Sequence, residues 1–165
     1  MSLPKSSYPW YALTVKHNHE KAVAKALEGR GIVHSLPLYQ RIAGGAEVLL
    51  FPNYVFCSLD ILHRLPALTI PGVSSFVSIG RGPAEISEQE LHDVETMIES
   101  RLKIEPHAFL CAGEEVDIEH GPLKGLRGIL VACKSNARLV VSVALLKRSV
   151  SVEIDRAWVR QKSAA

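Results

Sequence analysis

The chain has 165 residues and a formal net charge of +2, and 47% of its residues are hydrophobic against 22% that are charged. This composition is typical of a soluble globular protein and excludes an intrinsically disordered chain. No stretch approaches the ~20 consecutive apolar residues of a membrane helix, and no apolar signal segment follows Met1, so we expect a cytoplasmic protein that makes no membrane contact.

The first hundred residues alternate predicted strands with predicted helices. The predicted strands cover residues 10–16, 32–40, 48–59 and 73–79, and the predicted helices cover residues 19–30, 61–69 and 87–102. Pro52 interrupts the third strand and removes a backbone donor, which is typical of an edge strand or a bulge. Ser87 and Glu90 have the spacing of a capping box and begin the last helix. We therefore expect an α+β domain over residues 1–102, with helices packed on one side of a mostly antiparallel sheet.

The remaining residues are predicted to form a linker and a small all-β barrel. Residues 103–111, with Pro106 near their centre, are the expected linker, and the barrel is expected over residues 112–165. Val116 and Ile118 alternate with acidic residues, as in a half-buried strand. Two more β-branched runs follow, at residues 138–143 and 149–154, and an expected turn at residues 134–137 precedes them.

The charge is unevenly divided between the two parts. Residues 1–100 carry eight basic and ten acidic residues, whereas residues 101–165 carry eleven basic and seven acidic ones. This modest basic excess in the second part fits an auxiliary contact with nucleic acid or the ribosome better than a stand-alone DNA binder, which normally has a concentrated basic face.

The sequence contains no catalytic constellation, so we expect a protein that is not an enzyme and needs no cofactor. Among the seven histidines only His17 and His19 lie close together, and no plausible set of further ligands accompanies them, so no metal site is expected. The three cysteines form no CxxC pair and are interpreted as buried, inert thiols.

Several segments of the chain resemble one family of transcription factors. These segments are Trp10-Tyr11-Ala12-Leu13, Leu50 to Phe56, Pro71 to Val77 and Ile86 to Leu91, together with the Gly-Pro turn and glycine spacing of residues 112–131. They are similar, in the same order, to the NGN and KOW domains of the NusG family. The Phe51-Pro52-Asn53-Tyr54 form and the short central segment look closer to the specialised RfaH-like antitermination paralogs than to housekeeping NusG.

The resemblance implies an exposed apolar pocket on the NGN domain that receives the clamp helices of the largest RNA polymerase subunit. The residues at the matching positions are Trp10, Tyr11, Phe51, Pro52 and Tyr54. Monomeric proteins seldom expose a contiguous apolar patch, and aromatic side chains anchor interfaces, so such a patch would be informative. From the residues alone, an ordinary place in the core is the better explanation of Phe51, Tyr54 and Phe56, whereas the resemblance favours exposure of Phe51 and Tyr54.

The resemblance also places a cationic cluster near upstream or non-template DNA. The cluster consists of Lys16, His17, His19, Lys21 and Lys25 at a strand-to-helix junction. Lysines there would neutralise phosphates and make binding depend on salt. Lys21 and Lys25 are one helical turn apart and share a face. The alternative interpretation is an ordinary solvated helix face.

In the barrel, four residues match the segment that contacts Rho or a small-subunit ribosomal protein in NusG proteins. These residues are Leu145, Leu146, Lys147 and Arg148. Leu146 and Lys147 replace the usual aromatic and glycine, and loss of an aromatic anchor weakens an interface. We therefore do not expect Rho as a partner, whereas a small-subunit ribosomal protein stays possible.

Taken with its resemblance, the sequence predicts a monomeric transcription elongation and antitermination factor. The N-terminal domain is expected to bind RNA polymerase and suppress pausing or termination, and the KOW barrel is expected to recruit a second partner through a flexible linker. The alternative is a ribosome-associated or RNA-binding KOW protein with a structural role, which would need a more strongly basic barrel.

Overall fold

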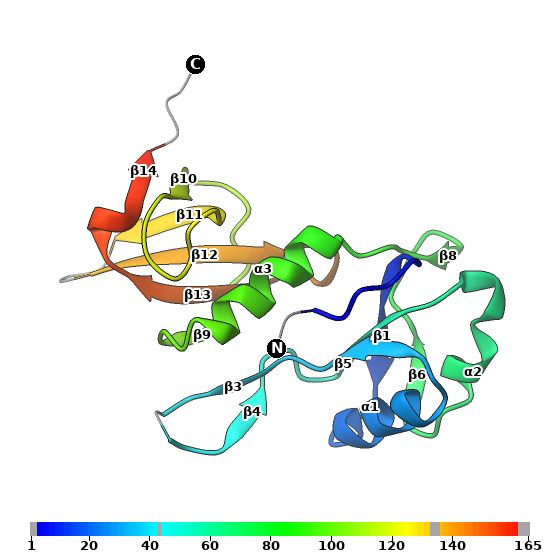
Figure 1. The fold of residues 1–165 in the computed structure, drawn as a ribbon. Coiled ribbons are helices and arrows are strands. Elements are labelled where there is room, and N and C mark those ends of the chain that lie inside the picture. Colours follow the sequence, from blue (N-terminus) through cyan, green and yellow to red (C-terminus); the bar gives the residue numbers. More distant parts are fainter. Residues whose placement is uncertain (1–2, 43, 133–135, 162–165) are drawn as a thin grey trace.

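A computed structural model describes residues 3–42, 44–132 and 136–161 and contains an N-terminal α+β domain followed by a small antiparallel β-barrel (Figure 1). This confirms the predicted fold class. The N-terminal sheet has the strand order β2-β5-β1-β6. Its strands are β1 (Trp10–Val15), β2 (Val33–Ser35), β5 (Tyr54–Ser58) and β6 (Val73–Phe76). Every pairing in this sheet is antiparallel, and Leu13 in the central strand lies opposite Val55 on one side and Phe76 on the other.

Helices cover both faces of this sheet, which corrects the expectation of helices on one side only. Tyr11 and Leu13 pack against α1 (Glu20–Gly29), which contributes Val23 and Leu27 to the same buried cluster. Trp10 and its neighbours on the opposite face pack against α3 (Glu88–Glu99). The physical reason is the two-residue period of β1, whose side chains are buried in both directions. A central strand buried on both faces needs cover on both faces.

Prolines divide two of the predicted strands. The strand expected over residues 32–40 is interrupted at Pro37 and forms β2 and β3 (Leu38–Gln40). The strand expected over residues 48–59 is interrupted around Pro52 and forms β4 (Glu47–Leu49) and β5. β3 and β4 pair with each other as a separate hairpin, with Tyr39 opposite Val48. In Figure 1 this hairpin extends from the N-terminal domain below the barrel.

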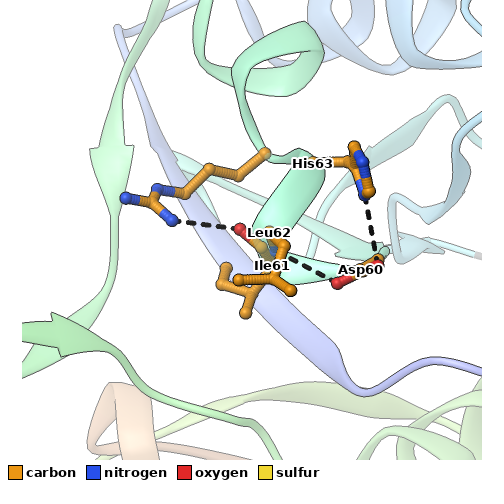
Figure 2. A network of polar contacts seen from close by, with 5 residues as sticks. Asp60, Ile61, Leu62 and His63 are labelled. Atoms are coloured by element: carbon orange, nitrogen blue, oxygen red, sulfur yellow. Dashed lines mark hydrogen bonds and ion pairs between the residues drawn. The ribbon is translucent and has the colours of Figure 1, made fainter.

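A short helical segment follows β5 and is fixed by local polar contacts. It consists of the 3-10 turn η1 (Ile61–His63) and the helix α2 (Leu65–Leu68). Figure 2 shows Asp60 at its start, where one carboxylate oxygen accepts from the Leu62 N–H at 3.0 Å and the other lies 3.2 Å from His63 Nδ1. The Leu62 hydrogen bond, with a smaller contribution from His63, lowers the pKa of Asp60. A small two-stranded hairpin, β7 (Ser78–Ile79) with β8 (Gly82–Pro83), precedes α3.

The capping box at the start of α3 is only half formed. Ser87 Oγ accepts from the Glu90 N–H at 3.2 Å, as predicted. The Glu90 carboxylate is not used to close the box; its Oε2 accepts from the Ala144 N–H in the barrel at 3.0 Å. A residue that would cap its own helix therefore ties that helix to the second domain.

The barrel contains six antiparallel strands in the order β14-β10-β11-β12-β13-β9. They are β9 (Ile104–His107), β10 (Glu114–Ile118), β11 (Arg127–Ala132), β12 (Ala137–Val143), β13 (Arg148–Ile154) and β14 (Val159–Gln161), with the 3-10 turns η2 (Ala144–Leu146) and η3 (Arg156–Trp158). Val116 and Ile118 are buried, as their alternation predicts. Gly128 permits a close approach between strands, because an added Cβ would lie 2.7 Å from the Val140 carbonyl oxygen. The expected turn at residues 134–137 lies partly outside the described residues.

The segment predicted as a linker contains a strand of the barrel. Residues 104–107 form β9, which pairs with β13 so that Pro106 lies opposite Val150. Pro106 is tolerated because β9 is the edge strand of the sheet, where a missing N–H leaves no ladder bond unpaired. The linker expectation for residues 103–111 therefore differs from the structure, and sheet residues begin close to the end of α3.

The two domains share one buried cluster. Leu91, Val94 and Met97 from α3 belong to the same apolar cluster as Val141 and Val143 from β12. Figure 1 shows α3 running across the barrel, between it and the rest of the N-terminal domain. The helix is thus sandwiched between the N-terminal sheet and the barrel.

Two further sequence expectations concern cysteines and membranes. Cys57 is buried, and burial raises its pKa to about 12, as expected of an inert thiol. Cys111 is exposed, so the expectation of burial is wrong for this residue, because it lies on the loop between β9 and β10. Cys133 lies outside the described residues. No helix within the described ranges is long and apolar enough to cross a membrane.

Candidate interaction surfaces

The Phe51 to Tyr54 segment is a tight turn fixed from three directions. The Tyr54 N–H donates to the Phe51 carbonyl at 3.3 Å, and the Val15 N–H donates to the Asn53 carbonyl at 2.8 Å. The Asn53 N–H donates to Glu20 Oε2 at 3.1 Å. Asn53 has a φ of 73°, a left-handed conformation that asparagine tolerates better than most residues. The turn is therefore held rigidly on the N-terminal sheet.

Glu20 is the buried support of this turn. Its side chain is only 1% exposed, and its Oε1 atom finds no hydrogen-bond donor among the described residues. A buried carboxylate oxygen without a donor is costly and rare in proteins. The position in the first turn of α1 favours a negative charge there. Sequence reasoning missed this residue, whose only signal was an acidic residue at a predicted helix start.

The proposed polymerase-binding aromatics are mostly buried, which corrects the expectation of an exposed apolar pocket. Trp10, Tyr11 and Phe51 are 1%, 4% and 3% exposed. The Phe51 ring packs edge to face against Phe56 with the ring centroids 5.6 Å apart. Burial of Trp10 and Tyr11 follows from their positions in β1, where they face opposite sides of a sheet covered by helices on both sides.

Pro52 and Tyr54 are the accessible members of this group. Pro52 is exposed and Tyr54 is half-buried against the core cluster. Pro52 at the tip of the turn and Tyr54 at the start of β5 thus offer surface that Phe51 does not. The structure therefore separates the five predicted residues into two surface positions and three that lie beneath.

The predicted cationic cluster lies on the surface of the strand-to-helix junction. Lys16, His17, His19, Lys21 and Lys25 are all exposed. The Lys16 N–H donates to the Gly72 carbonyl at 2.9 Å, and His19 Nδ1 lies 3.0 Å from the His17 carbonyl oxygen, so the backbone of the junction is fixed. Within the described ranges none of the three lysines makes an ion pair. Their charges are free to meet an anionic partner.

A hollow of about 830 Å³ brings residues from the three predicted groups together. Its lining includes Phe51 and Pro52 from the turn, His17 and Lys21 from the cationic cluster, and Arg148 from the barrel. We call it the turn hollow. It lies where the start of α1, the β3–β4 hairpin and the β9 and β13 strands meet. No sequence pattern could reveal it, because it depends on how the two domains contact each other.

The predicted partner-binding segment of the barrel connects β12 to β13. Leu145 is half-buried and Leu146 is buried, whereas Lys147 and Arg148 are exposed. Lys147 has a φ of 50°, a left-handed conformation at a position where the matching family segment has glycine. The segment begins beside Ala144, the residue that donates to Glu90. It therefore lies at the edge of the contact with α3.

Three carboxylates of α3 are affected by packing on either side of the helix: Glu90 and Asp93 lie beside the barrel, and Glu95 lies beside β2, where Ser35 Oγ donates to it at 2.9 Å. Burial raises the pKa of Glu90, Asp93 and Glu95, and each is partly compensated by a hydrogen bond, from Ala144, Gln89 and Ser35 respectively. The part of the chain that the structure describes contains no group of three or more potential metal-binding side chains.

Comparison with known proteins identifies the class of this molecule. The sequence matches the family described as "Transcription termination factor nusG" over residues 8–95, more than half of the chain. An α+β domain followed by a β-barrel, with the first domain matched over almost its full length, defines a two-domain transcription factor. The chain belongs to the NusG family.

Relatives and a solved structure agree with this assignment. The chain is 23% identical to the transcription termination/antitermination protein NusG of Helicobacter pylori, with 88% of this chain and 93% of that protein covered. It is 27% identical to the protein of the same name from Campylobacter jejuni, with 90% and 94% covered. A structure titled "Domain interaction in Thermotoga maritima NusG" has the same fold, with a TM-score of 0.56, 20% identity and 95% and 98% of the two chains covered.

Proposed function

We propose that this NusG-family protein binds RNA polymerase through its N-terminal domain, suppresses pausing or termination, and recruits a second partner through its barrel. The observation that carries the proposal is the family match over residues 8–95, which contains the anchored Phe51 to Tyr54 turn. Binding to one polymerase conformation in preference to another is sufficient for this action, so we expect no catalytic step. An RNA-binding KOW protein with a purely structural role would leave the match of the N-terminal domain without a purpose.

In this proposal the polymerase clamp helices contact the turn through Pro52 and Tyr54. Trp10, Tyr11 and Phe51 support that surface from beneath, because they are buried in this structure. The rigid backbone of the turn favours binding, since little conformational freedom is lost when the partner arrives. The RfaH-like specialisation of the chain is part of the same proposal and rests on the Phe-Pro-Asn-Tyr form of the turn.

A binding measurement with purified RNA polymerase tests this contact. Replacing Pro52 and Tyr54 together with alanine should weaken binding about thirtyfold, or ~2 kcal/mol, because a few anchoring side chains carry most of the binding energy of an interface. Tyr8→Ala is the matched control, since Tyr8 is an aromatic residue that is 53% exposed elsewhere on the same domain. A folded double variant that binds polymerase like the wild type would remove these two residues from the interface.

The cationic cluster is proposed to contact upstream or non-template DNA in the elongation complex. Lys16 and Lys25 are exposed and unpaired in the described chain, so neutralising each should lower the salt slope of DNA association by roughly 0.7–0.9. Crosslinking in an assembled elongation complex that finds no DNA near Lys16 or Lys25 would contradict the assignment.

The barrel is proposed to bind a small-subunit ribosomal protein rather than Rho. Leu146 is 7% exposed, and Lys147 brings a charge that must stay solvated, so neither offers the aromatic anchor of the usual segment. In a purified transcription assay containing Rho, added protein should leave termination unchanged or increase read-through. Earlier Rho-dependent release would show that the barrel does recruit Rho.

A further inference from the structure

A second hollow, of about 370 Å³, lies where α3 meets the barrel. α3 contributes Glu90 and Asp93, the loop after β9 contributes Phe109, and strands β10, β11 and β12 contribute most of the rest. We call it the acidic hollow. None of residues 145–148 lines it, so it is a surface separate from the proposed ribosomal contact.

The acidic hollow has an apolar lining and a fixed aromatic side chain. Its apolar members are Phe109, Leu110, Val116, Ile129, Val140 and Val141. The ring of Phe109 is 39% exposed. The loop that carries it is held to the barrel, because the Leu110 N–H donates to Ser149 Oγ at 3.0 Å and Ser142 Oγ donates to the Leu110 carbonyl at 2.8 Å. The exposed ring is therefore presented in one position.

The charged groups of the acidic hollow are mainly negative. Among the described residues that line it, four are carboxylates and one is a cation, namely Glu90, Asp93, Glu115 and Asp117 against Arg127. Arg127 is already engaged, since its Nε lies 2.8 Å from Asp117 Oδ1. Within the described ranges neither Glu90 nor Asp93 makes an ion pair. The hollow therefore keeps a net negative charge.

Glu90 and Asp93 are held in place by neutral donors. Glu90 Oε2 accepts from the Ala144 N–H at 3.0 Å, and Asp93 Oδ1 accepts from Gln89 Nε2 at 2.8 Å. Burial is the largest influence on the pKa of both carboxyls and raises it. A cation that entered the hollow would relieve part of the cost of burying these charges.

We propose that the acidic hollow binds an arginine side chain presented by a segment of a partner protein. A guanidinium forms paired hydrogen bonds with carboxylates and stacks on an aromatic face, and its apolar stem suits an apolar lining. The volume lies at the lower end of ligand cavities, so it suits a side chain and its flanking backbone better than a whole cofactor. Nucleic acid is disfavoured, because the carboxylates would repel its phosphates.

The site requires both domains. Glu90 and Asp93 belong to α3 of the N-terminal domain, whereas Phe109 belongs to the loop that is fixed to the barrel. A bound arginine would bridge the two domains and strengthen the contact that Glu90 makes with Ala144. The inference goes beyond the proposed function, since it involves neither polymerase nor residues 145–148.

The test uses the full chain without polymerase. Fluorescence anisotropy measures the binding of a short labelled peptide that alternates arginine with leucine. A second peptide carries citrulline, which is uncharged and nearly the same shape, in place of each arginine. One variant combines Glu90→Gln with Asp93→Asn, and glutamine at position 90 keeps an oxygen that accepts from the Ala144 N–H.

A second variant and a control complete the design. Phe109→Leu keeps an apolar side chain at the rim and removes the aromatic face. The matched control for the charge change combines Glu85→Gln with Glu88→Gln, because both are exposed acidic residues near the start of α3 that do not line the hollow. Circular dichroism confirms that each variant is folded.

The double variant at Glu90 and Asp93 should bind the arginine peptide about tenfold more weakly, since two partly buried ion pairs are lost. Phe109→Leu should weaken binding about two- to fivefold, as expected for the loss of an exposed cation–π contact. The citrulline peptide should bind the wild type at least about tenfold more weakly than the arginine peptide. The control should change by less than about twofold.

Three results would overturn the proposal. In the first, the Glu90 and Asp93 variant and Phe109→Leu bind the arginine peptide as the control does. In the second, the citrulline peptide binds as tightly as the arginine peptide, which would show that the hollow selects apolar side chains without regard to charge. In the third, spermine competes as well as the unlabelled arginine peptide, which would identify a free polyamine as the occupant.

Discussion

Phe51 should act through stability rather than through direct contact with polymerase. Its ring is 3% exposed and packs edge to face on Phe56, which is fully buried. Replacing a buried phenylalanine with alanine removes about 3–5 kcal/mol of folding free energy, because the cavity adds to the lost transfer energy. For a chain of this size the loss corresponds to a fall of roughly 6–20 °C in Tm, at about 2–4 °C for each kcal/mol.

Thermal and urea unfolding of Phe51→Ala measure this effect. Phe51→Leu should recover more than half of the loss, since it refills most of the cavity with an apolar side chain. Phe109→Ala is the control, because Phe109 is 39% exposed on the loop after β9 and its loss should cost no more than about 1 kcal/mol. Polymerase affinity is then measured below the transition, where the variant is folded.

The two roles of the turn separate in this experiment. If Phe51→Ala unfolds at the wild-type temperature, the ring does not support the core and the burial argument fails. If it is destabilised as expected and yet binds polymerase normally at low temperature, the contact depends on Pro52 and Tyr54 alone. A destabilised variant that also binds weakly while folded would show that the ring orients the turn for its partner.

Three further predictions follow from individual contacts. The pKa of Asp60 is lowered in the folded protein, so its carboxylate stabilises the fold above the unfolded-state pKa. This stability is lost as the pH falls through the folded-state pKa of Asp60. Asp60→Asn should therefore reduce the loss of stability that urea unfolding measures below about pH 4. The pKa of Glu90 is raised in the folded protein, so the free energy of unfolding rises as the pH falls from neutral and Glu90 takes up a proton. Glu90→Gln should flatten this part of the plot of unfolding free energy against pH. A plot that is unchanged in Glu90→Gln would show that Glu90 does not cause this pH dependence. Gly128→Ala should cost ~1–3 kcal/mol because its Cβ would clash with a backbone carbonyl, whereas Gly29→Ala, with open space in a helix, should be neutral or stabilising by up to ~1 kcal/mol.

Local sequence patterns predicted the elements that consist of an apolar run or an apolar stripe. β1 and β12 are mostly apolar runs, β13 alternates serine with β-branched residues, and α1 has an apolar stripe, so local patterns were sufficient to predict them. β9 could not be predicted in this way. Four residues around Pro106 resemble a linker until β13 lies beside them, because the strand exists only through its ladder with residues 149–152.

Long-range contacts decided the features of the candidate sites that local patterns did not predict. The sequence indicated which aromatics belong together, but the exposure of a side chain depends on what packs above it. Phe51 and Tyr54 enter one turn, yet one ring is enclosed by Phe56 while the other reaches the surface. The same holds for Arg41 and Arg148, which are far apart in the chain and line one hollow only because α3 joins the domains. A charge pattern spread over two domains acquires meaning only once their contact is known, and here that contact brings Arg41 of the N-terminal domain and Arg148 of the barrel to one hollow.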